Sequence, residues 1–237
     1  MLQIKNYSME YVKGKKVIDG LNLSVREGDI YAFVGRNGVG KTTTIKSIVG
    51  INHITEGDIT LDKISILKDP IKYKSMIAYI PDNPILYEHL TGIQYLNFIA
   101  DIFELTYKQR EKAIKEYATK FELYDALGNL VSSYSHGMKQ KLVLIGAFMH
   151  DPKMYVLDEP FVGLDPKASF TLKELLREKA KEGKIIFFST HVLDVAEKLC
   201  NRIAIIKDGK LLVDGDMDRI IKDKSLEETF MELVVDE

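Results

Sequence analysis

The feature that most constrains this chain is a glycine-rich octapeptide at residues 35–42, which reads GRNGVGKT. It fits the pattern G-x-x-x-x-G-K-[ST] at every fixed position, between an apolar run at residues 30–34 and a helical stretch at residues 42–49. This order predicts a strand, then a loop whose backbone N–H groups surround a phosphate, then a helix whose positive end faces the same anion. The chain is therefore expected to bind a nucleotide through its phosphates.

Two side chains of this loop have predicted chemical roles. Lys41 supplies a cation for the β- and γ-phosphates, and Thr42 supplies a hydroxyl for Mg²⁺. The glycines let successive N–H groups curl round the anion without interference from a Cβ atom. The complete predicted phosphate site consists of Gly35, Arg36, Asn37, Gly38, Val39, Gly40, Lys41, Thr42 and Thr43.

A second motif, MYVLDEP at residues 154–160, predicts a carboxylate pair for hydrolysis. Four apolar residues put Asp158 at the end of a buried strand, where an ionised carboxylate is costly unless it faces a cation. Mg²⁺ is the natural cation, usually bound through water. Glu159 comes next, and strand alternation predicts that its side chain leaves on the other face. There it can orient and deprotonate an attacking water.

The remaining sequence alternates strand-like and helical segments. Apolar runs at residues 30–34, 76–80, 154–157, 185–189 and 203–206 predict a mostly parallel sheet covered on both faces. The first 30 residues instead predict an antiparallel β-layer, and residues 84–150 lack strands and predict an inserted helical subdomain. The predicted fold is α/β, a single domain over residues 1–237. It has a P-loop NTPase core at 1–83 and 151–224, and a C-terminal helix at 225–237.

Composition excludes several other kinds of protein. The 33 basic and 35 acidic residues give a net charge of −2, and this balance argues against a protein that binds nucleic acid through an overall positive charge. The single cysteine excludes an intramolecular disulfide and is typical of a cytosolic chain. No window approaches the ~18 apolar residues of a membrane span. If the protein serves a membrane, it is expected to do so through another polypeptide.

A second anion site is predicted where the helix 137–150 begins. Residues 134–141 read YSHGMKQK, in which Ser135 is a candidate N-cap and Gly137 exposes backbone N–H groups. The helix, roughly 21 Å long, separates Ser135 from the strand that carries Asp158. The two sites are therefore not expected to contact one nucleotide within one chain. A second copy, turned face to face, would bring Ser135 to its partner's γ-phosphate, which predicts a two-fold dimer with nucleotide in the interface.

These motifs together resemble those of the ATP-binding subunits of ABC transporters, over almost the full length of the chain. The resemblance implies ATP and Mg²⁺ as ligands, and Tyr11 as the aromatic ring that stacks on adenine. It implies Glu159, His191 and Lys41 as the catalytic residues, with His191 contacting the γ-phosphate. The implied Mg²⁺ ligands are Thr42, Asp82 and, through water, Asp158. The residues implied to contact ATP across the dimer are Ser135, His136, Gly137, Met138 and Asp165.

Three positions depart from that family's usual pattern. Asp82 stands where most members have Gln, so it keeps an oxygen ligand but adds charge and loses reach. His136 replaces the first glycine of the family signature, and Met138 replaces its glutamine. The backbone N–H groups that would bind the phosphate remain at these positions. The three replacements are therefore expected to affect the turnover rate and not the function.

Longer segments resemble one branch of the family, the bacterial ABC-2-type exporters and their Ecs-type subunits. They are YIPDNPILYEHLT at 79–91, SHGMKQKL at 135–142, EPFVGLDP at 159–166 and STHVLDVAEKLC at 189–200. The resemblance implies a motor subunit bound to a separate membrane-spanning permease at the cytoplasmic face of the membrane, with no nucleic-acid partner. Its ATPase partner would be a second copy or a paralogue, and residues Pro84–Glu104 would form most of the surface that couples to the permease.

The alternative is a soluble ABC ATPase that acts in translation or on chromosomes. The translation factors resemble two cassettes in one chain, and the chromosome proteins carry long coiled coils. A chain of 237 residues with one phosphate loop fits neither arrangement.

Overall fold

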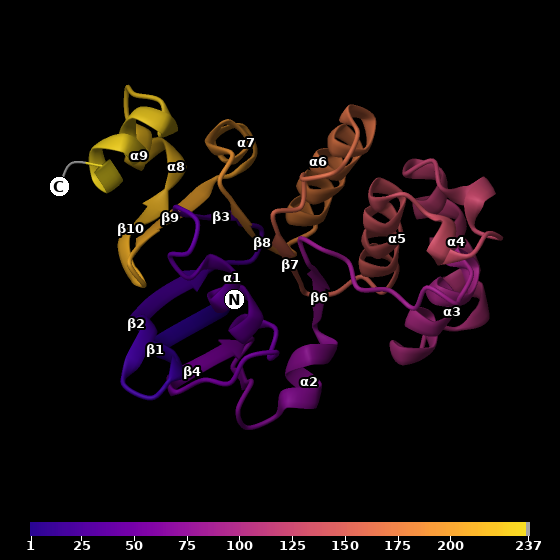
Figure 1. The fold of residues 1–237 in the computed structure, drawn as a ribbon, viewed down its shortest axis with the longest axis horizontal. Helices are drawn as coiled ribbons and strands as arrows, with labels where there is room; N and C mark the ends of the chain where they lie inside the picture. Colours follow the sequence, from indigo (N-terminus) through magenta and orange to yellow (C-terminus); the bar gives the residue numbers. More distant parts are fainter. Residues whose placement is uncertain (236–237) are drawn as a thin grey trace.

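The computed structural model describes residues 1–235 and the side chains of residues 1–234, which form two β-sheets and a helical subdomain (Figure 1). Sheet A is antiparallel, in the order β2 (Lys15–Val25), β1 (Leu2–Val12), β4 (Glu56–Leu61) and β5 (Ile64–Ser65). Sheet B has the order β10 (Lys210–Asp216), β9 (Arg202–Lys207), β3 (Ile30–Val34), β8 (Ile185–Thr190), β7 (Met154–Asp158) and β6 (Ile77–Ile80). Its strands β9 to β6 pair in parallel, and β10 returns beside β9 as a hairpin.

The α-helices follow the chain as α1 (Lys41–Ile48), α2 (Pro70–Ser75), α3 (Gly92–Ile102), α4 (Tyr107–Lys120), α5 (His136–Met149), α6 (Pro166–Lys181), α7 (Leu193–Leu199), α8 (Met217–Ile221) and α9 (Leu226–Val235). Two 3-10 turns, at Tyr124–Ala126 and Val131–Ser133, join α4 to α5. Figure 1 shows α3, α4 and α5 grouped at one end of the molecule, beyond β6 and β7, with α9 at the opposite end.

Strand β3 separates the two parts of the core because its successive side chains point to opposite faces. Tyr31 and Phe33 face a cluster that contains α1 and sheet A, and both are fully buried. Ala32 and Val34 face the second cluster, which includes α5, α6 and α7. A strand buried on both faces reads as a continuous apolar run, as residues 30–34 do. Helix α1 is thus held between the two sheets, and this places the loop before it at the carboxyl end of β3.

The helical subdomain begins its helices with well-formed caps. Thr91 and Thr106 each accept a hydrogen bond from a backbone N–H three residues on, and the side chains of Gln94 and Gln109 accept one from the backbone N–H of the cap residue. This reciprocal capping box satisfies donors that a helix start leaves unpaired. Helix α5 begins at the predicted N-cap Ser135 and is buried along most of its length. It therefore runs through the centre of the subdomain, from the Ser135 end to His150.

The predicted α/β fold with a mostly parallel sheet, an antiparallel layer and a helical insertion is confirmed. The predicted antiparallel layer was too small, since β4 and β5 extend it to Ser65. The C-terminal helix is present over Leu226–Val235, and residues 236–237 of that prediction lie outside the described residues. In the part of the chain that the structure describes, no helix is both long and apolar enough to cross a membrane.

Candidate active site

The loop between β3 and α1 wraps around the Lys41 ammonium group. Lys41 is 6% exposed, and its Nζ donates to the carbonyls of Gly35 (2.8 Å) and Arg36 (3.2 Å). Gly40 has a φ of 109°, and a Cβ atom there would lie 2.4 Å from Cδ1 of Ile18 on β2. The left-handed backbone favours glycine at position 40, and the short approach to Ile18 shows that sheet A packs directly against the phosphate loop.

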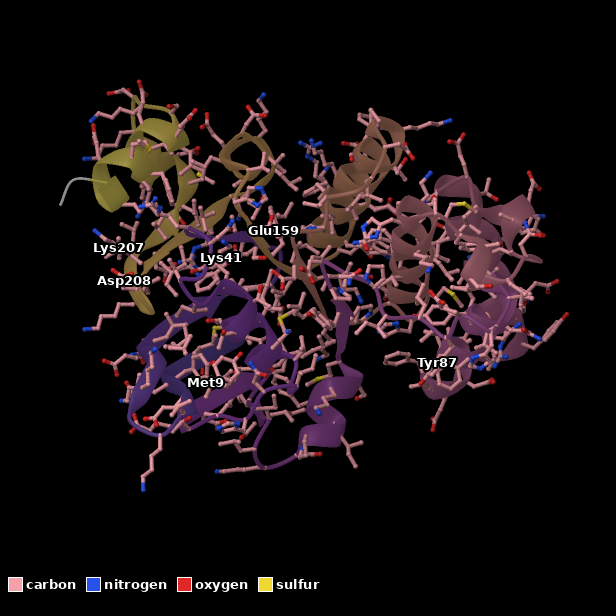
Figure 2. All side chains as sticks on the ribbon, in the orientation of Figure 1. Met9, Lys41, Tyr87, Glu159, Lys207 and Asp208 are labelled. Carbon is pink, nitrogen blue, oxygen red and sulfur yellow. The ribbon has the colours of Figure 1, made fainter. Side chains whose placement is uncertain are left out.

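Burial and the neighbouring carboxylates act on the Lys41 ammonium group in opposite directions. Burial lowers the pKa of Lys41, whereas the charges of Glu159 and Asp158 raise it. Figure 2 places Lys41 and Glu159 close together at the centre of the molecule. Because a buried ammonium loses hydration, phosphate oxygens at this position would restore the interactions that the charge lost.

Asp158 at the end of β7 has one carboxylate oxygen without a partner. The residue is 1% exposed, and Oδ1 accepts a hydrogen bond from the Ser189 hydroxyl, while Oδ2 is buried with none. Burial raises the pKa of Asp158, and the hydroxyl groups of Ser189 and the nearby Thr42 lower it. A carboxylate oxygen that is buried and unpartnered beside the Thr42 hydroxyl fits a divalent cation, directly or through water. Among the described residues no cluster of three or more His, Cys, Asp or Glu side chains could hold a metal.

This burial predicts that Asp158→Asn stabilises the nucleotide-free protein at neutral pH. The folded chain binds more protons than the unfolded chain between the ordinary and the raised pKa of Asp158, so stability falls as the pH rises through that interval. The gain should be on the order of 1–3 kcal/mol at neutral pH. It should shrink as the pH falls toward about 3.9, the ordinary value for aspartate. Thermal unfolding would measure it, with the exposed turn variant Asp208→Asn as the control. An asparagine variant that unfolds at a lower temperature than wild type at neutral pH would contradict the prediction.

Glu159 lies immediately after β7, in a left-handed backbone conformation with a φ of 47°. Strand alternation was expected to set the direction of the Glu159 side chain, and this expectation was wrong. Strand β7 ends at Asp158, so the left-handed turn sets where the Glu159 side chain points. A non-glycine residue in this conformation is strained and is found preferentially at functional sites. The Glu159 backbone N–H lies 3.3 Å from both the carbonyl and the hydroxyl oxygen of Ser189.

The structure brings Glu159 and His191 together. Nδ1 of His191 lies 3.0 Å from Oε1 of Glu159, and the His191 backbone N–H donates to Oε2 at 3.4 Å. The Glu159 side chain is 17% exposed and that of His191 is 53% exposed. Glu159 is therefore oriented from the next strand while it stays open to solvent, as a group that activates water must be.

Two predicted residues lie at the margins of this group. Tyr11 near the end of β1 is 59% exposed, and its hydroxyl contacts Oγ1 of Thr43 (3.3 Å) and Nδ2 of Asn52 (3.1 Å). Its ring is thus anchored beside α1 with much of its surface free for an aromatic ligand. Asp82, after β6, is exposed, and its charge contributes to the raised pKa of Asp158.

The predicted second anion site lies apart from the phosphate loop. Ser135 caps α5 by accepting from the backbone N–H of Met138 at 3.3 Å, and both Ser135 and His136 are exposed. The Met138 side chain is partly buried and packs against the core. In the described part of the chain, no hydrogen bond or ion pair joins residues 135–138 to residues 35–43.

Asp165 belongs to this second group. It caps α6 through Ala168, whose N–H lies 2.8 Å from Oδ1, and its Oδ2 pairs with Nζ of Lys141 on α5 at 2.7 Å. This ion pair lowers the pKa of Asp165. The predicted site residues therefore fall into two groups, one at the carboxyl ends of strands of sheet B and one at the starts of α5 and α6.

Sequence reasoning missed several supporting residues. Ser189 holds both members of the carboxylate pair, and it could have been found as a polar residue ending an apolar strand parallel to β7. Asn52 and Ile18 support Tyr11 and Gly40 from elsewhere in the chain. No local sequence signal marks them.

Comparisons with known proteins find similar chains over most of the sequence. The family model described as ABC transporter matches residues 18–162. The chain is 32% identical to the ABC-type transporter ATP-binding protein EcsA of Bacillus subtilis (strain 168), over 98% of this chain and 96% of that protein. It is 34% identical to the SkfA peptide export ATP-binding protein SkfE of the same strain, over 90% of this chain and 88% of that protein. A solved structure described as the ATP-binding subunit of an ABC transporter has a TM-score of 0.94 and 34% identity, covering 98% of this chain and 99% of that one.

Proposed function

This chain belongs to the ABC transporter family, whose ATP-binding subunits it matches, and from that premise we propose how its residues drive an exporter. It is an ATP-binding and ATP-hydrolysing subunit. The observation that carries the assignment of residues is the arrangement of Lys41, Asp158 and Glu159 at the carboxyl ends of β3 and β7. Ser189 on β8 donates to the Asp158 carboxylate and accepts from the Glu159 backbone N–H.

Each of these residues has a distinct proposed role in hydrolysis. Lys41 and the N–H groups of residues 35–43 bind the phosphates, and the Tyr11 ring stacks on adenine. Thr42, Asp158 and Asp82 would hold Mg²⁺, which neutralises charge on the β- and γ-phosphates when bound. Glu159 accepts the proton of the attacking water, and His191 orients Glu159 and reaches the γ-phosphate.

A second ATPase subunit completes the site. Ser135, His136, Gly137 and Met138 form the start of α5, and Asp165 caps α6 and pairs with Lys141 on α5, so these residues form one group. A helix N-terminus attracts a phosphate through its free N–H groups and its dipole. The proposed assembly is a two-fold dimer, with a copy or a paralogue, in which each chain's second half-site closes the other's nucleotide.

The surface proposed for the permease lies where the helical subdomain meets the core. A groove of about 260 Å³ there is lined largely by apolar side chains of β6, α3 and α5, including Tyr95, Ile99 and Phe103. Exposed apolar side chains lie nearby in sequence, on α2, on the segment before α3 and on α3 itself. We define the coupling face as Ile71, Ile85, Tyr87, Phe98 and Ile102. Figure 2 shows Tyr87 on this subdomain, away from Lys41.

Exposed apolar side chains at this density indicate a protein partner. Helix α5 runs from this groove, at Gly146 and His150, to the second half-site at Ser135. It therefore connects the permease surface to the nucleotide interface as one rigid element. ATP closes the dimer, hydrolysis opens it, and the permease at the cytoplasmic face of the membrane receives the motion.

An arginine in place of Ile85 tests this surface. Ile85 is 94% exposed in the isolated subunit. Ile85→Arg should lower the fraction of the subunit retained on cell membranes about tenfold, because a charge buried in an apolar interface is costly. The measurement is membrane fractionation of cells that express the complete transporter. Met231→Arg on α9, at the opposite end of the molecule, is the matched control (Figure 1). Equal membrane retention of both variants would contradict the proposed face.

A further inference from the structure

The loop from Glu159 to Asp165 packs against the first turn of α5 at Gly163. Gly163 has a φ of 80°, and a Cβ atom on it would lie 2.6 Å from Cδ2 and 2.9 Å from Nε2 of His136. The His136 ring thus occupies the space that any other residue at position 163 would need. A Cβ atom on Gly137 would in turn lie 3.0 Å from the Gly163 carbonyl oxygen. The histidine and the glycine are therefore complementary in size.

A second contact joins the same two segments one turn along α5. Lys141 lies four residues after Gly137, so both are on one face of the helix. The Lys141 side chain is 14% exposed and pairs with Asp165, the residue that ends the loop and caps α6. The loop is thus fixed to α5 at its centre by ring packing and at its end by an ion pair.

The beginning of the loop carries the proposed base. The Val162 backbone N–H donates to the Glu159 carbonyl at 3.2 Å, which makes residues 159–162 a tight turn directly before Gly163. A displacement of Gly163 is therefore passed to the turn that places Glu159. Misplacing a reacting group by about 1 Å can cost about a hundredfold in rate.

We propose that His136 is a positioning residue, whose ring packs on Gly163 and fixes the loop 159–165 relative to the nucleotide-contacting end of α5. The subunit then presents the second half-site and its own Glu159 as one rigid unit when the dimer closes. This inference rests on the proposed function, since it explains how residues of that site are held. It assigns the ring's packing surface the main role, and not its nitrogen atoms.

A double-mutant cycle on the full-length protein tests this contact. His136→Gly should lower kcat about tenfold with little change in the ATP concentration that gives half the maximal rate. Gly163→Ala should also lower kcat, because its methyl group displaces the ring. In the double variant Gly163→Ala should lower kcat much less than it does in the wild-type background, because the contact is already lost and only the left-handed strain at position 163 remains. His136→Phe should recover most of the rate and keep the wild-type pH profile, because it restores the packing surface of the ring without the imidazole nitrogens.

Left-handed strain at position 163 has its own control. Gly183 has a φ of 86° with open space around it, so Gly183→Ala measures the cost of that conformation alone in thermal unfolding. Independent, multiplicative losses in the cycle would overturn the inference. So would a phenylalanine variant as slow as the glycine variant, which would assign the effect to the imidazole nitrogens. An inactive wild-type protein would instead contradict the proposed function, so the two failures are distinguishable.

Discussion

Glu159→Gln is expected to slow ATP hydrolysis by about 10²- to 10⁴-fold, the range that a positioned general base contributes. Glutamine keeps the size and can still accept a hydrogen bond from the His191 N–H, but it cannot take a proton from water. ATP binding should remain, and an ATP-bound dimer should accumulate because the step that opens it is blocked. Steady-state phosphate release and light scattering with ATP measure the two effects.

His191→Ala separates positioning of the base from its chemistry. This variant should also be slow, but it retains the Glu159 carboxylate and should therefore keep a residual pH-dependent rate that Glu159→Gln lacks. Turnover at the wild-type rate in Glu159→Gln would show that another group is the base.

Lys41→Ala is expected to have the largest effect on nucleotide binding. The ammonium group is buried within the phosphate loop and its contacts there are with carbonyls that a phosphate can replace. Losing charge-assisted hydrogen bonds to phosphate should weaken ATP binding about 10- to 100-fold. Titration with a fluorescent ATP analogue measures this loss.

Lys46 provides the matched control for Lys41. It lies on the same helix, away from the loop, and Lys46→Ala removes an equal charge from α1. If both variants lose the same affinity, the effect of Lys41 is one of net charge and not of a specific phosphate contact.

Most of the nucleotide half-site could be predicted because its chemistry is local in the sequence. The phosphate loop needs a strand, glycines and a helix start within about 20 residues, and Asp158 needs only an apolar strand before it. The N-cap Ser135 is equally local, since it is predicted from one residue and the turn that follows. These features are specified by neighbours along the chain.

The contacts that support the site could not be predicted, because they join residues far apart in the chain. Ser189 reaches Asp158 only when β8 lies beside β7, and Ile18 restricts Gly40 only when sheet A covers the loop. The left-handed turn at Glu159 depends on where β7 ends. The complementarity of His136 and Gly163 requires the packing of α5 against a loop more than twenty residues later. Only the tertiary structure brings these pairs together.

The central claim is that each nucleotide is held between two chains, and mixing two inactive variants tests it most directly. Ser135→Arg blocks the second half-site and Lys41→Ala disables the phosphate loop, so each homodimer should be inactive. A heterodimer of the two retains one intact composite site. An equimolar mixture should therefore recover about a quarter of wild-type ATPase activity, because half of the dimers carry one working site of two. A mixture as inactive as its components, with wild-type activity per molecule independent of protein concentration, would contradict the dimer.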